Sequence, residues 1–359
     1  MNYDKNSFLA GLAAGRQMKG WAGITKSGSI TPSGGMIDAL ITGDINVTVA
    51  SDVDKMRAYA FFGCSSLPSV SLPNVKIIQM GAFCGCSALS SANIPLATKV
   101  ESQAFANCIA LASADFPEVA EIDTEAFRGC SALENINMPL AKSIGNTAFR
   151  DCESLMSADF PNALTIGTDT FRTCRALASA NIPKVSVVKG NAFNGCIALT
   201  AIQLPAATRL ETAAFIDCTS LSAIYAPLAE YVGNSAFKSC IELTNINLPK
   251  ATELGTYALA ECYGLTKVIV PKIEDIGNRA FENSEALTAI VLRDGTGPTT
   301  VPYAPSSNAF GGTPMASTAT GGYFYVPRSM LETFSTGSWR AYYNAGKFRA
   351  IEDYPSILD

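Results

Sequence analysis

The stretch AFANCIAL, residues 104–111, recurs along the chain at a fixed interval. Close copies read AFRGCSAL at 126–133, AFRDCESL at 148–155 and AFNGCIAL at 192–199. Each copy places a cysteine three residues after a phenylalanine, and a leucine three residues after the cysteine. Self-similarity of this kind predicts one structural unit that is repeated along the chain.

The cysteines define the period of this repeat. Ten of the eleven cysteines stand 22 residues apart, and Ser284 takes the next place in the series. The ten are Cys64, Cys86, Cys108, Cys130, Cys152, Cys174, Cys196, Cys218, Cys240 and Cys262. A period in this range predicts a solenoid with a short strand in each turn. Stacked units then bury a continuous core that no single unit could bury alone.

The whole unit reads A-F-x-x-C-x-x-L-x-x-[IAV]-x-[apolar]-P-x-[AVI]-x-x-[IVL], followed by three further residues. It resembles the leucine-rich repeats of the BspA type, which occur in bacterial surface proteins and in some protist proteins. The resemblance covers residues 57–292. It implies a right-handed solenoid with parallel sheets, and it does not imply an enzyme.

Three segments of the unit predict its local structure. LENINMP (133–139) predicts a strand that ends at proline, because proline has no N–H for the ladder. AKSIG (141–145) predicts a second short extended piece, and AFRGCSAL (126–133) predicts a compact helical turn. The expected fold class is therefore an α+β solenoid of 22-residue leucine-rich repeats. It combines parallel sheets with short helical turns and is capped at both ends.

The chain divides into four expected regions. Residues 1–21 form an N-terminal docking segment with a short helix, and residues 22–56 form a capping region with a degenerate repeat. Residues 57–292 form the solenoid, and residues 293–359 form a divergent last repeat and a C-terminal cap. In the last region we expect strands at Tyr323–Val326 and near Phe348–Ile351, with a helix after Pro327.

The amino terminus reads MNYDKNSFLAGLAAGRQMKGW (1–21). It resembles the starts of some phage or prophage tail-associated proteins of gut Firmicutes, a short likeness that implies docking to a larger assembly. Asp4 precedes a short apolar run, whereas a secretory signal needs positive charge and a longer run there. We therefore expect no signal peptide.

The composition narrows the classes of function. The 359 residues include no histidine, and 31 acidic against 26 basic residues give a net charge of −5. Without histidine there is no Ser–His or Cys–His nucleophile pair, so we expect no enzyme and no cofactor. A carboxylate-based hydrolase stays as the less favoured alternative. The acidic balance gives no support for a nucleic-acid partner, and no long apolar segment predicts membrane insertion.

We interpret the ten periodic cysteines as a structural core column of reduced thiols, because free cysteine is small, apolar and commonly buried. Side chains stacked in a column point the same way, which does not suit disulfide geometry. A linear column also does not converge on a metal ion. Cys84 lies off the column and is the candidate for a reactive thiol.

Alternation along the predicted strands places one polar column on the outer face of the solenoid. We take this column as the ligand-binding hypothesis: Asn93, Asp115, Asn137, Asp159, Asn181, Gln203, Tyr225 and Asn247. It continues into the apolar residues Ile269 and Val291. The alternative is a solvated face without a ligand.

A second candidate is a row of Arg128, Arg150 and Arg172, one in each turn, which could hold an anion. The favoured alternative is ion pairing with Glu125, Asp151 and Glu153, which lie close in sequence.

These features together predict a non-enzymatic attachment protein that recognises a protein or a glycan on a host cell surface. In one version residues 1–21 dock it to a virion or tail-like particle, and it resides in the cytoplasm before assembly. In the alternative version it is an exported surface adhesin of the BspA type, located on the cell surface.

Overall fold

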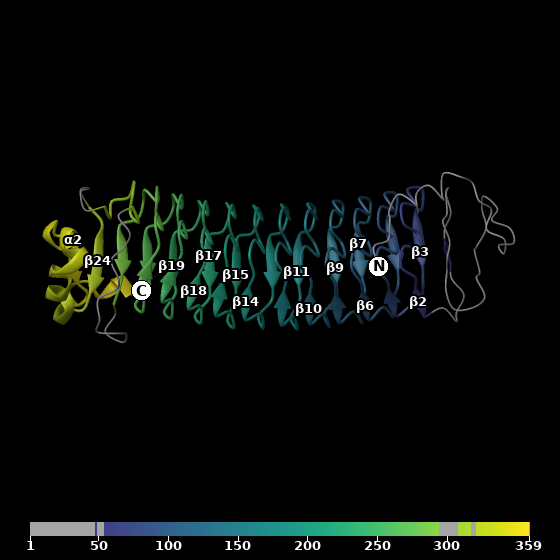
Figure 1. Ribbon diagram of the computed structural model, residues 1–359, viewed down its shortest axis with the longest axis horizontal. Coiled ribbons are helices and arrows are strands. Elements are labelled where there is room, and N and C mark those ends of the chain that lie inside the picture. The colour runs from purple at the N-terminus through teal and green to yellow at the C-terminus, as the bar shows by residue number, and fades with distance from the viewer. Residues whose placement is uncertain (1–46, 49–53, 294–307, 317–320, 359) are drawn as a thin grey trace.

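The computed structural model describes residues 47–48, 54–293, 308–316 and 321–358. The chain forms an elongated rod along which two rows of strands run (Figure 1). Each 22-residue unit makes one turn, with a three-residue strand in the first row and a two-residue strand in the second. The expected docking segment 1–21 and the residues Ile45 and Val53 of the degenerate repeat lie outside the described residues.

The first row begins with β1 (Val47–Thr48). Its three-residue strands are β3 (Ser69–Ser71), β5 (Ser91–Asn93), β7 (Ser113–Asp115), β9 (Asn135–Asn137), β11 (Ser157–Asp159), β13 (Ser179–Asn181), β15 (Ala201–Gln203), β17 (Ala223–Tyr225), β19 (Asn245–Asn247), β21 (Lys267–Ile269) and β23 (Ala289–Val291).

The second row contains the two-residue strands. They are β2 (Lys55–Met56), β4 (Ile77–Ile78), β6 (Lys99–Val100), β8 (Glu121–Ile122), β10 (Ser143–Ile144), β12 (Thr165–Ile166), β14 (Val187–Val188), β16 (Arg209–Leu210), β18 (Tyr231–Val232), β20 (Glu253–Leu254) and β22 (Asp275–Ile276). Pairing in both rows is parallel, with a register of 22 residues as for Ile144 and Ile166, and the first pair, β1 with β3, is offset by 23 residues, as for Val47 and Val70. The parallel sheets and the 22-residue turn confirm that part of the predicted fold class.

The expected helical turn at the cysteine is wrong. Two residues in each turn take the left-handed conformation, for example Glu125 (φ 59°) and Gly129 (φ 73°). Along this segment, backbone N–H groups donate alternately within the turn and to the next turn. Cys130 N donates to Phe127 O at 3.1 Å, whereas Phe127 N donates to Ala148 O of the next turn at 2.8 Å. The segment is therefore tied to its neighbour like a strand and never builds the i to i−4 ladder of a helix.

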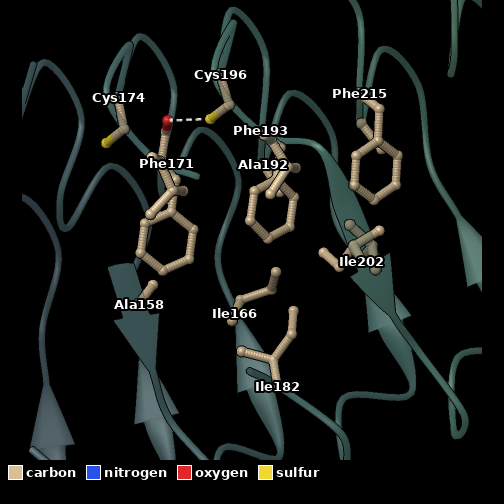
Figure 2. Packing of buried hydrophobic residues seen from close by; sticks show 14 of the residues in the cluster. Ala158, Ile166, Phe171, Cys174, Ile182, Ala192, Phe193, Cys196, Ile202 and Phe215 are labelled. Carbon is tan, nitrogen blue, oxygen red and sulfur yellow. Dashed lines mark hydrogen bonds between the residues drawn. The ribbon is translucent and has the colours of Figure 1, made fainter. Parts of the chain in front are cut away.

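Phenylalanine rings form a stack along the core. The rings of Phe127 and Phe149 lie 5.2 Å apart and are inclined by 1°, and Figure 2 shows Phe171, Phe193 and Phe215 in the same arrangement. All these rings are buried. Stacking of identical residues from successive turns provides the continuous core that the period predicts.

The cysteine column makes a second contact between turns. The Sγ of Cys196 donates to the carbonyl oxygen of Phe171 at 3.1 Å, drawn as the dashed line in Figure 2. The column cysteines from Cys86 to Cys262 all make this bond, and all ten members of the column are buried thiols. Ser284 makes the equivalent hydrogen bond, because its hydroxyl donates to the carbonyl oxygen of Leu259 at 2.7 Å. Each side chain thus links its own turn to the preceding one.

The C-terminal segment extends the first row. Strands β24 (Tyr323–Val326) and β25 (Phe348–Ala350) follow β23 in parallel, close to where the sequence predicts them. The expected helix after Pro327 is mainly 3₁₀ in form. The elements between and after these strands are η1 (Arg328–Ser335), η2 (Gly337–Trp339), α2 (Arg340–Asn344), η3 (Ile351–Asp353) and η4 (Pro355–Leu358).

Aromatic side chains of this segment join the main core. The Phe324 ring meets Trp339 edge-on at 5.2 Å and lies 5.3 Å from Phe348. These three residues are buried in the same cluster as the phenylalanine stack. Within the described residues, no helix has the length and apolar character needed to cross a bilayer.

Candidate binding face

The polar column lies on the outward side of the first row, which we call the strand face. Its residues Asn93, Asp115, Asn137, Asp159, Asn181, Gln203, Tyr225 and Asn247 are all exposed. The strand alternation accounts for this, because the next residue in each turn is a buried apolar side chain such as Phe116 or Met138. Parallel register then brings side chains of neighbouring turns together, as for Asp115 and Asn137.

Aspartate and asparagine on this face are joined in pairs. The Nδ2 of Asn137 donates to Oδ1 of Asp115 at 2.7 Å. The Nδ2 of Asn181 donates to Oδ1 of Asp159 at the same distance. A charged acceptor strengthens such a bond, so each pair holds a carboxylate in a defined orientation on an exposed surface.

The two pairs follow a period of two repeats, which the 22-residue consensus does not contain. SADFP occurs at 113–117 and again 44 residues later at 157–161, with Asn137 in the turn between them and Asn181 in the turn that follows. The signal was present in the sequence as this 44-residue spacing. The arrangement separates the two aspartates by a neutral amide and avoids like charges on adjacent strands, which destabilise a sheet.

The 44-residue spacing also appears in the core, in the residues that follow the two aspartates. Phe116 follows Asp115, and its ring lies 5.6 Å from that of Phe105 and 6.2 Å from that of Phe127. Phe160 follows Asp159 and packs in the same way. Each aspartate is therefore attached to a strand that is anchored in the aromatic stack, which restricts its movement.

Leucines lie beside the strand face, just after the proline of their turn. Leu96 and Leu140 are 44% and 43% exposed, in the turns that carry Asn93 and Asn137. The face thus combines exposed amides and carboxylates with exposed apolar side chains.

The strand face ends before the last turns, contrary to the sequence-based expectation of an apolar outward column there. Ile269 and Val291 are buried, and they pack in one cluster with Tyr325 and Ile351. Residues 351–358 supply Ile351 and the partly buried Ile357 to this cluster. The apolar side chains occur where the chain covers its own sheet, so the exposed column stops at Asn247.

The row of arginines is charge-compensated. Arg128 pairs with Glu125 at 3.2 Å and Arg150 pairs with Asp151 at 3.4 Å. Arg172 pairs with Asp169 at 3.3 Å, a partner that the sequence analysis did not name. Neighbouring acids thus occupy the guanidinium groups, which weakens the hypothesis of an anion site.

The thiols of the cysteine column are not reactive nucleophiles. Burial raises the pKa of the Cys130 thiol well above its ordinary value and that of Cys262 to about 12. A thiol is nucleophilic only as the thiolate, so the column serves packing and hydrogen bonding. Cys84 is half-buried beside the column.

A parallel solenoid of 22-residue turns with an exposed strand face defines a leucine-rich repeat protein. A model of the BspA type leucine rich repeat region matches residues 45–155, 98–222 and 164–288, which together span well over half of the chain. The chain belongs to this BspA type leucine-rich repeat family. Among curated proteins, none matches it.

Solved structures similar to this chain include a leucine-rich repeat protein from Bacteroides ovatus. It is 21% identical, with 85% of this chain and 83% of that chain covered, at a TM-score of 0.46. A leucine rich cell surface protein from Faecalibacterium prausnitzii is 23% identical over 75% of this chain and 88% of that chain, at a TM-score of 0.45.

Proposed function

We propose that the protein is a non-enzymatic attachment protein that binds a protein partner at a cell surface through its strand face. The observation that supports this proposal most directly is the presence of two exposed, hydrogen-bonded Asp–Asn pairs on the face, Asp115 with Asn137 and Asp159 with Asn181. Leucine-rich repeat proteins generally bind proteins, and solenoids offer extended surfaces for that purpose. A glycan ligand is the second candidate, favoured only by the density of amide groups on the face.

The regions outside the strand face have proposed roles that follow from this function. Residues 1–21 would dock the protein to a larger assembly such as a tail-like particle, with cell-surface export as the alternative arrangement. Residues 22–56 and 293–359 would shield the two ends of the solenoid core. The aromatic packing of Phe324, Trp339 and Phe348 supports the second of these roles.

The test replaces Asp115, Asn137, Asp159 and Asn181 together by alanine and measures attachment of labelled protein to a panel of bacterial and epithelial cells. The matched control replaces four exposed polar residues at the second row: Lys142, Ser143, Thr165 and Ser186. We expect the first variant to lose attachment and the second to retain it.

Protease treatment of the cells distinguishes the two kinds of ligand. It should abolish attachment of the unchanged protein if the partner is a protein, and periodate oxidation of surface sugars should leave attachment intact. Attachment by the fourfold strand-face variant at the level of the unchanged protein would contradict the proposal.

A further inference from the structure

Negative charge gathers on and next to the first strands of the strand face. Asp115, Glu118, Glu134 and Asp159 are exposed, and no ion pair joins any of them to another described residue. The exposed Lys184, after β13, donates to Oδ1 of Asn162 at 2.7 Å. In the cysteine-side turns of the same repeats, Glu125, Asp151 and Asp169 are instead paired with arginines. The face therefore presents a field that favours a cationic partner.

Each Asp–Asn pair has oxygen atoms that the hydrogen bond within the pair does not use. Oδ1 of Asp115 accepts the Asn137 amide at 2.7 Å, and no other described residue donates to this carboxylate. The second carboxylate oxygen and the amide oxygen are both acceptors. A guanidinium group has five N–H donors in a planar fork, so one group can donate to both oxygens.

The spacing of the two pairs selects the shape of the partner. Asp115 and Asp159 are separated by two turns, and parallel strands lie about 4.8 Å apart, which places the carboxylates about 10 Å apart. A polyproline II segment has three residues per turn and rises about 3.1 Å per residue, so residues three positions apart in it point the same way and lie about 9 Å apart. Such a segment laid along the rod thus matches both pairs with a single three-residue repeat.

An exposed leucine can contact the residues between the cations. Leu140 follows β9, in the turn between those of Asp115 and Asp159, and Leu96 follows β5, one turn before Asp115. We propose that the partner binds as an extended polypeptide segment with two arginines or lysines three residues apart, which lies along β7 to β13. This inference rests on the proposed function, because it names the partner chemistry of the same face.

Defined peptides test this inference. Fluorescent twelve-residue peptides of glycine, serine, threonine and proline carry two arginines at a separation of two, three or five positions, and a further peptide carries glutamates instead. Binding is measured by fluorescence anisotropy at low salt, where exposed charges are least screened. We expect the three-position arginine peptide to bind most tightly and the glutamate peptide not to bind.

Isosteric charge removal identifies the site. Asp115→Asn with Asp159→Asn should weaken the best peptide about tenfold, because two exposed ion pairs, each of modest strength, are lost together. The control, Asp217→Asn with Glu285→Gln, removes the same charge from exposed positions off the strand face and should change binding less than twofold.

Equal binding at all arginine separations, or equal loss in both double variants, would overturn the inference. Failure of every arginine peptide to bind while the fourfold alanine variant still loses cell attachment would leave the face as the binding site and refute only its partner chemistry. A neutral glycan that binds the unchanged protein and not the fourfold variant would refute it as well.

Discussion

Cys130 donates its Sγ hydrogen to the carbonyl oxygen of Phe105, 25 residues earlier, at 3.1 Å. The same oxygen accepts the backbone N–H of Cys108 at 3.1 Å. The thiol is therefore more than a small apolar filler, because it links each turn to the turn before it. This role explains why a hydroxyl can take the place of the thiol at Ser284.

The first prediction concerns this link. Cys130→Ser keeps the donor and should cost less than about 1 kcal/mol of unfolding free energy, whereas Cys130→Ala loses the donor and leaves a small cavity, at about 1–2 kcal/mol. Cys130→Val also overpacks the site and should cost about 1–3 kcal/mol. Urea unfolding followed by circular dichroism measures the order. If Cys130→Ala lost no more unfolding free energy than Cys130→Ser, the thiol would only fill space.

The second prediction is a loss of stability at alkaline pH. Burial raises the pKa of the column thiols, to about 12 for Cys262, whereas an unfolded thiol ionises near about 8.5. The folded state keeps these protons. The contribution of the protonated thiols to the free energy of unfolding is therefore fully present below the unfolded pKa and is lost as the pH rises towards the folded pKa. The decline is about 1.4 kcal/mol per pH unit for each thiol.

Urea midpoints measured across the alkaline range test this decline. Tyrosines and lysines also ionise there, so the matched measurement uses Cys130→Ser, which removes one titrating group. Its stability should fall less steeply with pH, by about one proton. Identical slopes for the two proteins would contradict the assignment of the effect to the thiols.

The third prediction concerns the segment that covers the last turns. Deletion of residues 351–359 should expose Ile269, Val291 and Tyr325, which form a buried cluster with Ile351. The solenoid should stay folded, while the new apolar patch binds a hydrophobic dye and promotes self-association. Deletion of residues 355–359 alone retains Ile351 and should have a much smaller effect. A monomer without dye binding after the longer deletion would show that the cover is dispensable.

The fourth prediction concerns the stability of the strand face. Asp115, Asn137, Asp159 and Asn181 are exposed, so their replacement by alanine should cost within roughly 0.5 kcal/mol at each site. Thermal melting should therefore show nearly the same midpoint for the fourfold variant and for the unchanged protein. A large loss of stability would mean that the ladder holds the sheet together and that its variants cannot report on binding.

The period of the cysteines and phenylalanines was sufficient to predict a solenoid with parallel strands, because burial of a repeated unit leaves few other arrangements. The turn at each cysteine was not predictable in the same way. Residues such as Thr147 and Asp151 take positive φ without being glycine, since inter-turn bonds like Thr147 N to Thr168 O at 2.8 Å fix the backbone there. Such bonds exist only once the turns have stacked.

The outward direction of the polar column also followed from strand alternation, as at Asn137. The place where the exposed column ends did not follow from strand alternation. Ile269 and Val291 are covered by residues 351–358, which lie far away in the sequence. The pairing of aspartate with asparagine was visible only as a 44-residue spacing, and its meaning required the register of Asp115 with Asn137.

The central claim is that the strand face contacts a protein partner. A photo-cross-linking amino acid at position 137 places a reactive group on this face, and the same group at position 165 places one on the exposed second row. Both proteins are bound to cells of a type that the unchanged protein attaches to, and are then irradiated. We expect a protein adduct from position 137 and none from position 165. Adducts from position 165 alone would contradict the claim.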